Sequence, residues 1–303
     1  MASVKPVSVL SDFPVQSVQS FEICPFKDEV LGAEVLGLDT GSVLGLEDFT
    51  RIYRAFLRYK VLVFRNQSIT PEQQVRFSRL FGELQIHVLR QFLLPGRPEV
   101  FVISNILDER HQPVGLGDAG KFWHSDLSYK ALPSMGAMLH ARTLPEDGGD
   151  TLFADQQLAY ERLPEPVQRR LDGLQANHSY TATYHQPRHG DHWRPVLTSA
   201  QLEEVKEVLH PVVRTHPETG RKGLFVSESF TTRIEGLVDE ESRRLLDQLF
   251  AHSIRPEFIY RHRWQEHDLL FWDNRALIHL ATGCPDHLPR RMHRTTIQGD
   301  APF

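Results

Sequence analysis

The sequence predicts a mainly β fold, an antiparallel barrel or jelly roll decorated by helices, and three observations support this fold class. Short apolar and β-branched segments recur through the second half of the chain. Turns rich in glycine or proline separate them, for example at Glu146–Gly149 and Pro217–Gly220. This succession of short strands and turns is typical of all-β domains. Helical periodicity is confined to a few segments.

The N-terminal part is predicted to hold two helices with a strand between them. In Leu46–Tyr59 the apolar residues recur at helical spacing and give the segment one apolar face. Lys60–Phe64 is short and rich in β-branched residues, so we expect a strand. A second helix is expected from Thr70 to about Phe81, because Thr70 can cap it, proline follows at the first helical position and Gln73 stands where a capping-box partner belongs.

The rest of the chain is predicted to be strands with two helical inserts. The segments with strand-like composition are Ala137–Leu144, Thr151–Ala154, Pro211–His216, Gly223–Ser227, Phe258–Trp264, Leu269–Trp272 and Met292–Ile297. We expect helices at roughly Gln156–Leu171 and at Glu240–His252, the second capped by Asp239. Asn177–Trp193 holds four histidines without any period and is predicted to be a long loop.

Composition narrows the class of protein. The 303 residues are expected to form one domain, with 1–20 as an N-terminal extension and 175–195 as an active-site lid loop. A net charge of −5 offers no basic face for nucleic acid. The two cysteines, Cys24 and Cys284, argue against a disulfide scaffold. The sequence shows neither a signal peptide nor an apolar run that could span a membrane, so a cytoplasmic location is the default expectation.

A candidate metal site begins at His124-Ser125-Asp126. In a strand, residues i and i+2 lie on the same face with Cα atoms about 6–7 Å apart, so the imidazole and the carboxylate would stand side by side. Two histidines and one carboxylate leave three positions open on an iron ion, the arrangement of non-haem Fe(II) oxygenases. His189-Gly190-Asp191 has the same spacing, but it lies in the loop-like segment, so we favour the first pair.

Several segments in matching order resemble the taurine dioxygenase (TauD/TfdA) family of Fe(II)- and 2-oxoglutarate-dependent enzymes, from about Gly32 to Phe303. The matching segments are Phe122–Asp126, Gly148–Leu152, His210–Pro217, Phe271–Arg275, His279 and Arg290–Arg294. The resemblance implies a double-stranded β-helix, a jelly-roll barrel with the metal in its mouth. It also implies a dioxygenase that uses O2 and 2-oxoglutarate, releases succinate and CO2, and assembles as a homo-oligomer, a dimer or a tetramer.

The resemblance also assigns residues. It makes His124, Asp126 and His279 the Fe(II) ligands. It makes Thr151 and Arg290 the partners of the distal carboxylate of 2-oxoglutarate, and it places Arg294 near the other carboxylate and the substrate anion. Arginine suits this task because it is always charged and can bind a carboxylate with two hydrogen bonds. Halogenating relatives lack the carboxylate that Asp126 provides here, so hydroxylation is the expected outcome.

The substrate is expected to be a small organic anion other than taurine, such as a sulfonate, a sulfate ester or an aryloxyalkanoate. His87 matches the histidine that contacts the sulfonate in the taurine enzyme. Arg90 stands where that enzyme has a tyrosine, and Gly120 replaces an asparagine, so two polar groups that recognise taurine are missing. We expect His87, Arg90 and Arg294 to converge on one mouth.

Three alternatives remain open at this stage. A biosynthetic hydroxylase or desaturase of the same family would keep the chemistry and change the substrate. A non-catalytic jelly-roll binding module would need no clamp for a co-substrate, which the threonine and arginine positions argue against. A zinc hydrolase is disfavoured because the sequence has no His-Glu-x-x-His pattern.

Overall fold

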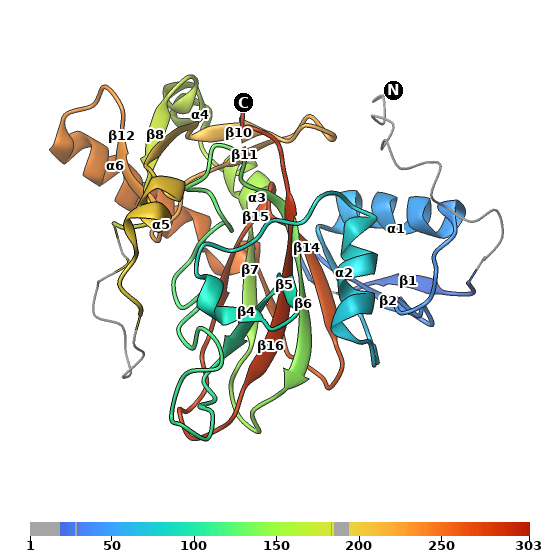
Figure 1. Ribbon diagram of the computed structural model, residues 1–303. Helices are drawn as coiled ribbons and strands as arrows, with labels where there is room; N and C mark the ends of the chain where they lie inside the picture. Colours follow the sequence, from blue (N-terminus) through green and yellow to red (C-terminus); the bar gives the residue numbers. More distant parts are fainter. Residues whose placement is uncertain (1–18, 28, 183, 185–193) are drawn as a thin grey trace.

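The computed structural model describes residues 19–27, 29–182, 184 and 194–303 (Figure 1). The helices are α1 (Leu46–Tyr59), α2 (Pro71–Arg79), α3 (Gln156–Glu161), α4 (Glu165–Leu171), α5 (Ser199–Glu204) and α6 (Asp239–Ser253), with 3₁₀ turns η2 (Arg90–Phe92) and η3 (Pro256–Phe258). The strands are β1 (Glu22–Pro25), β2 (Ala33–Leu36), β3 (Val61–Phe64), β4 (Leu93–Leu94), β5 (Arg97–Ser104), β6 (Ser134–Thr143), β7 (Thr151–Asp155), β8 (Gln175–His178), β9 (Val208–Pro211), β10 (Val213–Thr215), β11 (Lys222–Leu224), β12 (Thr231–Ile234), β13 (Ile259–His262), β14 (Leu269–Asp273), β15 (Leu277–Ala281) and β16 (Arg291–Gln298).

The strands form one large sheet and three small ones. The large sheet has the order β1-β2-β3-β14-β6-β16-β5-β4, and its pairs are antiparallel except for β2 with β3. A second sheet has the order β13-β7-β15, a third has the order β12-β8-β9, and β10 pairs with β11. The central neighbours of the large sheet, such as β3 with β14 and β6 with β16, are far apart in sequence, as expected for a jelly roll rather than a simple meander.

The main apolar core lies between the large sheet and the β13-β7-β15 sheet. Trp272 and Met292 project into it from the large sheet, and Phe153 and Tyr260 project from the small one. The rings of Phe153 and Trp272 have their centroids 5.7 Å apart. Since successive strand residues face opposite sides, every second residue of β14 enters this core and the others face away from it. The two sheets are thus held face to face around the region where the candidate ligands lie.

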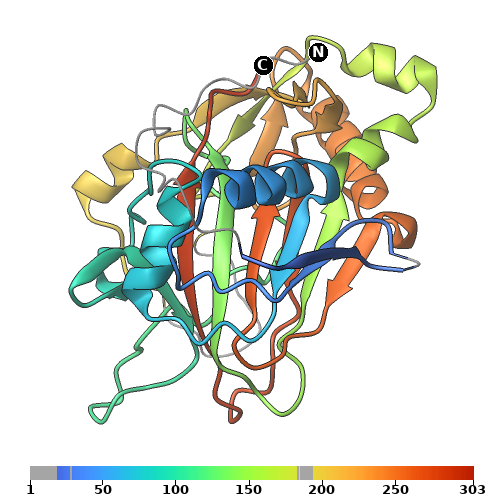
Figure 2. The same cartoon turned by 90° about the vertical axis from the view of Figure 1, so that its right-hand side faces the viewer.

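Helices α1 and α2 cover the outer face of the large sheet, as both views show (Figures 1 and 2). Phe56 of α1 stacks on Phe271 of β14 with ring centroids 4.0 Å apart, and Phe77 of α2 joins the same apolar cluster. The bounds of α1 agree with the predicted segment, and the predicted capping box of Thr70 and Gln73 is present at α2. In α1 the apolar period correctly placed Phe49, Ile52 and Phe56 on the buried face, whereas Leu46 is exposed.

The prediction of a mainly β fold with helical decorations is confirmed, with local corrections. The expected Gln156–Leu171 helix is two helices, α3 and α4, because Pro164 lacks an amide hydrogen and cannot continue α3. Helix α6 begins at Asp239 and is preceded by Val238, so Asp239 lies in the first turn instead of capping it. The expected Pro211–His216 strand is divided between β9 and β10.

The predicted loop also needs correction at its start. Residues Gln175–His178 form β8, which is hydrogen-bonded to β9 on one side and β12 on the other, so the first part of 175–195 is not a loop. The predicted decoy pair His189 and Asp191 lies outside the described residues. Among the residues that the structure describes, no helix has the length and apolar character needed to cross a membrane.

Candidate metal centre and active-site cavity

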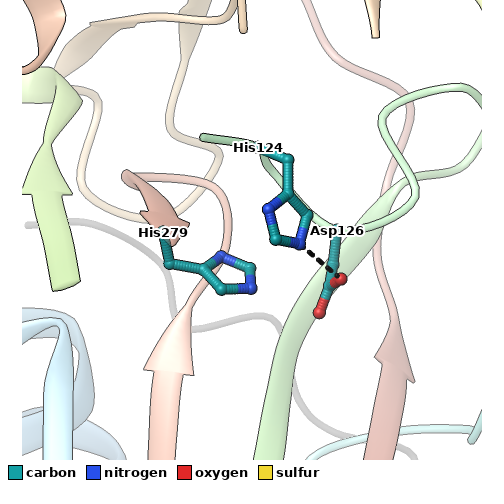
Figure 3. A group of neighbouring side chains, drawn as sticks. All are labelled: His124, Asp126 and His279. Carbon is teal, nitrogen blue, oxygen red and sulfur yellow. Dashed lines mark ion pairs between the residues drawn. The ribbon is translucent and has the colours of Figure 1, made fainter. Parts of the chain in front are cut away.

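His124, Asp126 and His279 come together at the mouth of the two-sheet core. One possible ligand atom from each lies within 4.8 Å of the others, and Figure 3 shows the three side chains directed toward one another. His124 Nε2 is 3.6 Å from Asp126 Oδ1. All three residues are buried. The structure therefore brings these three residues together, although His124 and His279 are 155 positions apart in the sequence.

Backbone pairing sets the distance between the two histidines. The N–H of His279, on β15, donates to the carbonyl of His124 at 2.8 Å, and the N–H of His124 donates in return at 3.1 Å. This isolated bridge is the only strand-like feature at His124 within the described chain, so the predicted strand through His124-Ser125-Asp126 is wrong. The backbone instead turns sharply, and Leu127 has a φ of 58°.

Asn274 fixes the position of Asp126, which does not lie on a strand. Its Oδ1 accepts the N–H of Asp126 at 2.7 Å, and its Nδ2 donates to the Asp126 carbonyl at 2.9 Å. Asn274 directly follows β14, so the carboxylate is fixed to the large sheet while His279 is fixed to the small sheet. The centre therefore depends on how the two sheets are placed relative to each other.

The electrostatics of the cluster favour a neutral His279 beside an ionised Asp126. His124 Nδ1 lies 2.9 Å from the Phe122 carbonyl and can only donate to it, which leaves Nε2 as a lone-pair donor facing Asp126. Burial and the neighbouring His124 hold the pKa of His279 well below its usual value. Burial alone would raise the pKa of Asp126, but Arg294 and the two histidines keep it well below the usual range.

This donor set fits a divalent transition metal. Asp126 Oδ2 and His279 Nδ1 are buried and have no hydrogen-bond partner among the described residues. A buried carboxylate oxygen without a partner is costly in a folded protein, and a bound cation would remove that cost. Two imidazoles and one carboxylate match the open facial set of non-haem Fe(II) sites.

Arg290 is a buried cation that forms no ion pair with an acidic residue of the described chain. Its Nη2 donates to the Gly149 carbonyl at 3.2 Å, and its Nε has no partner there. Burial lowers the pKa of Arg290 to about 10. The side chain lines a small cavity of about 30 Å³ together with Asn105, Lys121 and Cys284. A buried guanidinium facing a cavity is suited to an anionic ligand.

Thr151, the other predicted partner of the distal carboxylate, lies opposite a residue that lines the Arg290 cavity. It begins β7 and pairs with Ala281 of β15, which lines the Arg290 cavity. Its hydroxyl accepts a hydrogen bond from Trp264 Nε1 at 3.1 Å, so the hydroxyl hydrogen is available to donate to another acceptor. Gly149, which accepts from Arg290, is two residues before Thr151.

Arg294 of β16 connects the metal centre to a second cavity. Its Nη1 donates to Asp126 Oδ1 at 2.9 Å, and its guanidinium carbon lies 5.2 Å from the centre of the Phe101 ring. The cavity has a volume of about 60 Å³ and is lined by His124 and Asp126 as well as Arg294. It is therefore the space into which a reacting substrate would extend.

His87 lines this cavity, but Arg90 does not. The N–H of Leu89 donates to His87 Nδ1 at 3.1 Å, so the ring proton is on Nε2. Burial and the charge of Arg294 hold the pKa of His87 well below its usual value, which keeps the ring neutral. Arg90 instead points to the surface and pairs with Glu204 of α5 at 2.8 Å. The expected convergence of Arg90 with His87 and Arg294 is therefore wrong.

Sequence reasoning missed several residues that build the cavity. Tyr129, Tyr180 and Phe230 form an aromatic wall, with Tyr129 4.5 Å from Tyr180 and 5.0 Å from Phe230 between ring centroids. Arg194 also lines it. These residues carry no spacing pattern that points to a ligand. The available signal is that Tyr180 lies within the histidine-rich segment Asn177–Trp193 that the sequence singled out, and Arg194 directly follows it.

Comparison with known proteins identifies the family. The family model described as taurine catabolism dioxygenase TauD, TfdA family, matches residues 22–296. The chain belongs to this family. This dioxygenase is 35% identical over 281 residues to an alpha-ketoglutarate-dependent 2,4-dichlorophenoxyacetate dioxygenase of Cupriavidus pinatubonensis. The alignment covers 90% of this chain and 96% of that relative.

Two further relatives agree with this assignment. An alpha-ketoglutarate-dependent sulfate ester dioxygenase of Pseudomonas putida is 32% identical over 279 residues, covering 90% of this dioxygenase and 88% of that relative. The crystal structure of AAD-2 in complex with Mn(II) and N-oxalylglycine superposes with a TM-score of 0.76 at 32% identity, over 93% of this chain and 99% of that one. The chain is a 2-oxoglutarate-dependent dioxygenase, and the predicted class and fold are confirmed.

Proposed function

We propose that this dioxygenase binds Fe(II) through His124, Asp126 and His279. The observation that carries the proposal is the gathering of two imidazoles and one carboxylate, all buried, with their ligand atoms within 4.8 Å of one another. The hydrogen bond from His124 Nδ1 to a carbonyl directs its other nitrogen into the cluster, as in many metal-binding histidines. The unpartnered Asp126 oxygen supports the same assignment.

The co-substrate 2-oxoglutarate is proposed to bind between the two arginines of the β16 region. Arg290 and the Thr151 hydroxyl would bind its distal carboxylate, which would provide the counter-charge that the described chain does not offer to Arg290. Arg294 would lie near the carboxylate beside the metal, because it already contacts Asp126. Charge-assisted hydrogen bonds of this kind are about twice as strong as neutral ones.

The proposed reaction is O2-dependent hydroxylation of a small organic anion, with release of succinate and CO2. When bound, the ferrous ion supplies the activation of dioxygen, which no side chain of the protein can provide. The protein shields the reacting centre from water with Phe230 and Tyr129, and His87 offers a neutral Nε2–H to the substrate. The retained carboxylate of Asp126 supports hydroxylation over halogenation.

We propose an aryloxyalkanoate, a sulfate ester or a sulfonate other than taurine as the substrate. The support comes from the substrates of the two relatives named above and from the cavity itself, which combines cationic side chains with aromatic ones. Gly120, which lines the cavity where the taurine enzyme has an asparagine, offers no side chain to bind a sulfonate.

Anaerobic titration tests the iron and co-substrate assignments directly. Adding Fe(II) and 2-oxoglutarate to the purified protein should produce a weak visible charge-transfer band, and O2 should bleach it while succinate is released. His279→Ala should abolish both signals and still unfold cooperatively. His287→Ala, which changes an exposed histidine eight residues away, is the matched control and should behave as the unmodified protein. A band of unchanged intensity in His279→Ala would exclude this ligand set.

A further inference from the structure

Arg194 is a cation that lines the active-site cavity and has no role in the reaction proposed above. It lies between β8 and α5, and its side chain is 12% exposed. It lines the same cavity as His124, Asp126 and Arg294, but it approaches from a different part of the fold. The co-substrate assignment uses Arg290 and Arg294, so Arg194 is available for a second anion.

The position of the Arg194 guanidinium is fixed by two contacts. Its Nε donates to Asp118 Oδ2 at 2.7 Å, and the Asp118 side chain is fully buried. Its guanidinium carbon lies 5.1 Å from the centre of the Tyr184 ring. The Asp118 contact occupies one edge of a five-donor group, so the terminal Nη groups can still bind an oxyanion in a defined orientation.

The surroundings of Arg194 would let a ligand place its charged end and its apolar part against different parts of the cavity. Tyr129, Tyr180 and Phe230 form one apolar wall of the cavity, beside the iron-ligand candidate His124. An elongated substrate that places its anionic group at Arg194 can lay its apolar part along this wall. The carbon that reacts is then held next to the metal centre, and the charge is kept away from it.

We infer that Arg194, held by Asp118, binds the oxyanion of the substrate and determines the preference of this dioxygenase for anionic over neutral substrates. The inference rests on the proposed function and adds to it a residue and a ligand chemistry. Carboxylate, sulfate and sulfonate share the oxyanion that Arg194 recognises. Arg294 keeps its contact with Asp126 and its role toward the co-substrate.

The test measures ligand binding and turnover in the full-length protein. Phenoxyacetate and hexyl sulfate are the anionic probes, and phenoxyethanol is the neutral analogue of the first. Binding is followed by the ligand-induced shift in melting temperature under anaerobic conditions with Fe(II) and 2-oxoglutarate, and KM by succinate release. Arg194→Met should weaken the binding of the anions about 10- to 100-fold, the range for losing a charge-assisted hydrogen bond, and leave phenoxyethanol unaffected.

Three further variants make the result specific. Arg194→Lys retains the charge and should restore part of the preference for the anions. Arg90→Met removes an arginine of an exposed arginine–glutamate pair outside the cavity and should leave the binding of all three probes unchanged. The inference would be overturned if the unmodified protein bound neither anion. It would also be overturned if Arg194→Met lost affinity for the anionic and the neutral probes to the same extent. Lys121 also lines the cavity. If Lys121→Met selectively weakened the binding of the anions and Arg194→Met did not, the inference would be overturned as well.

The same experiment separates this inference from the proposed function. The charge-transfer band reports co-substrate binding, and Arg194→Met should retain it with an unchanged affinity for 2-oxoglutarate. If the unmodified protein shows no band, the proposed function fails. If the band is normal and Arg194→Met binds both anions like the unmodified protein, only the role of Arg194 fails.

Discussion

The surroundings of each buried arginine distinguish those that stabilise the fold from those that can bind a ligand. Arg275 is paired with Asp273 at 2.9 Å and with Glu218 at 2.5 Å, and these acids hold its pKa above the ordinary value despite burial. Burial lowers the pKa of Arg214 to about 10, but its guanidinium lies 4.8 Å from the centre of the Phe225 ring and lines none of the cavities described above. Arg290 combines burial, the absence of an acidic partner in the described chain and a cavity. That combination points to a ligand.

Replacing Arg290 therefore tests the co-substrate site at the residue scale. Arg290→Met should raise the KM for 2-oxoglutarate about 10- to 100-fold, because the distal carboxylate loses its charge-assisted partner. Since burying the cation without an acid is costly, the variant should be no less stable in thermal unfolding than the unmodified protein. Arg97→Met, at an exposed arginine of β5, is the control. An unchanged KM would place the distal carboxylate elsewhere.

At the scale of elements, structure that local residue spacing determines can be predicted from the sequence. Structure that depends on pairing between distant segments cannot. Helix α1 and the capping box of α2 follow from residue spacing and were predicted correctly. Strand β15, which carries His279, was not predicted, because its five residues have no clear strand pattern and acquire strand geometry by pairing with β7. Asp126 was placed on a strand that does not exist, since its position depends on Asn274, 148 residues away. Family resemblance selected the three residues that the structure brings together, but only packing shows that Arg90 faces solvent and Arg194 faces the cavity.

The two capping boxes provide a matched test of element stability. At α2, Thr70 Oγ1 accepts the Gln73 N–H at 3.3 Å, and α5 has the equivalent pair, Thr198 and Gln201, at 3.2 Å. Thr70→Ala should lower the free energy of unfolding by about 1 kcal/mol, because the buried face of α2 couples its N-terminus to the core. Thr198→Ala should cost less than about 0.5 kcal/mol, because α5 buries no residue and can open locally. Urea unfolding of both variants measures the difference, and equal losses would contradict this view.

At the scale of the molecule, the metal centre depends on how two sheets are held together. Asp126 is tied to the end of β14 and His279 lies on β15, so a shift between the sheets would separate the ligands. A buried ion pair crosses the same boundary. Lys60, which ends α1, donates to Asp155 Oδ2 at 2.5 Å, and Asp155 ends β7 and caps α3. Polar and apolar contacts thus fix one arrangement of the sheets.

Breaking that ion pair should weaken the whole fold and the metal centre together. Asp155→Ala leaves the Lys60 ammonium buried without its partner and removes the cap of α3, so the free energy of unfolding should fall by about 3–5 kcal/mol. Asp172→Ala, which breaks the exposed pair with Lys222 at 3.1 Å, should change it by less than about 1 kcal/mol. Urea unfolding of both variants measures these losses, and titration with Fe(II) and 2-oxoglutarate measures the centre. If Asp155→Ala lost stability but bound both ligands with unchanged affinity, the centre would not depend on the link between the sheets, and Asn274 with the His124–His279 bridge would be sufficient to assemble it.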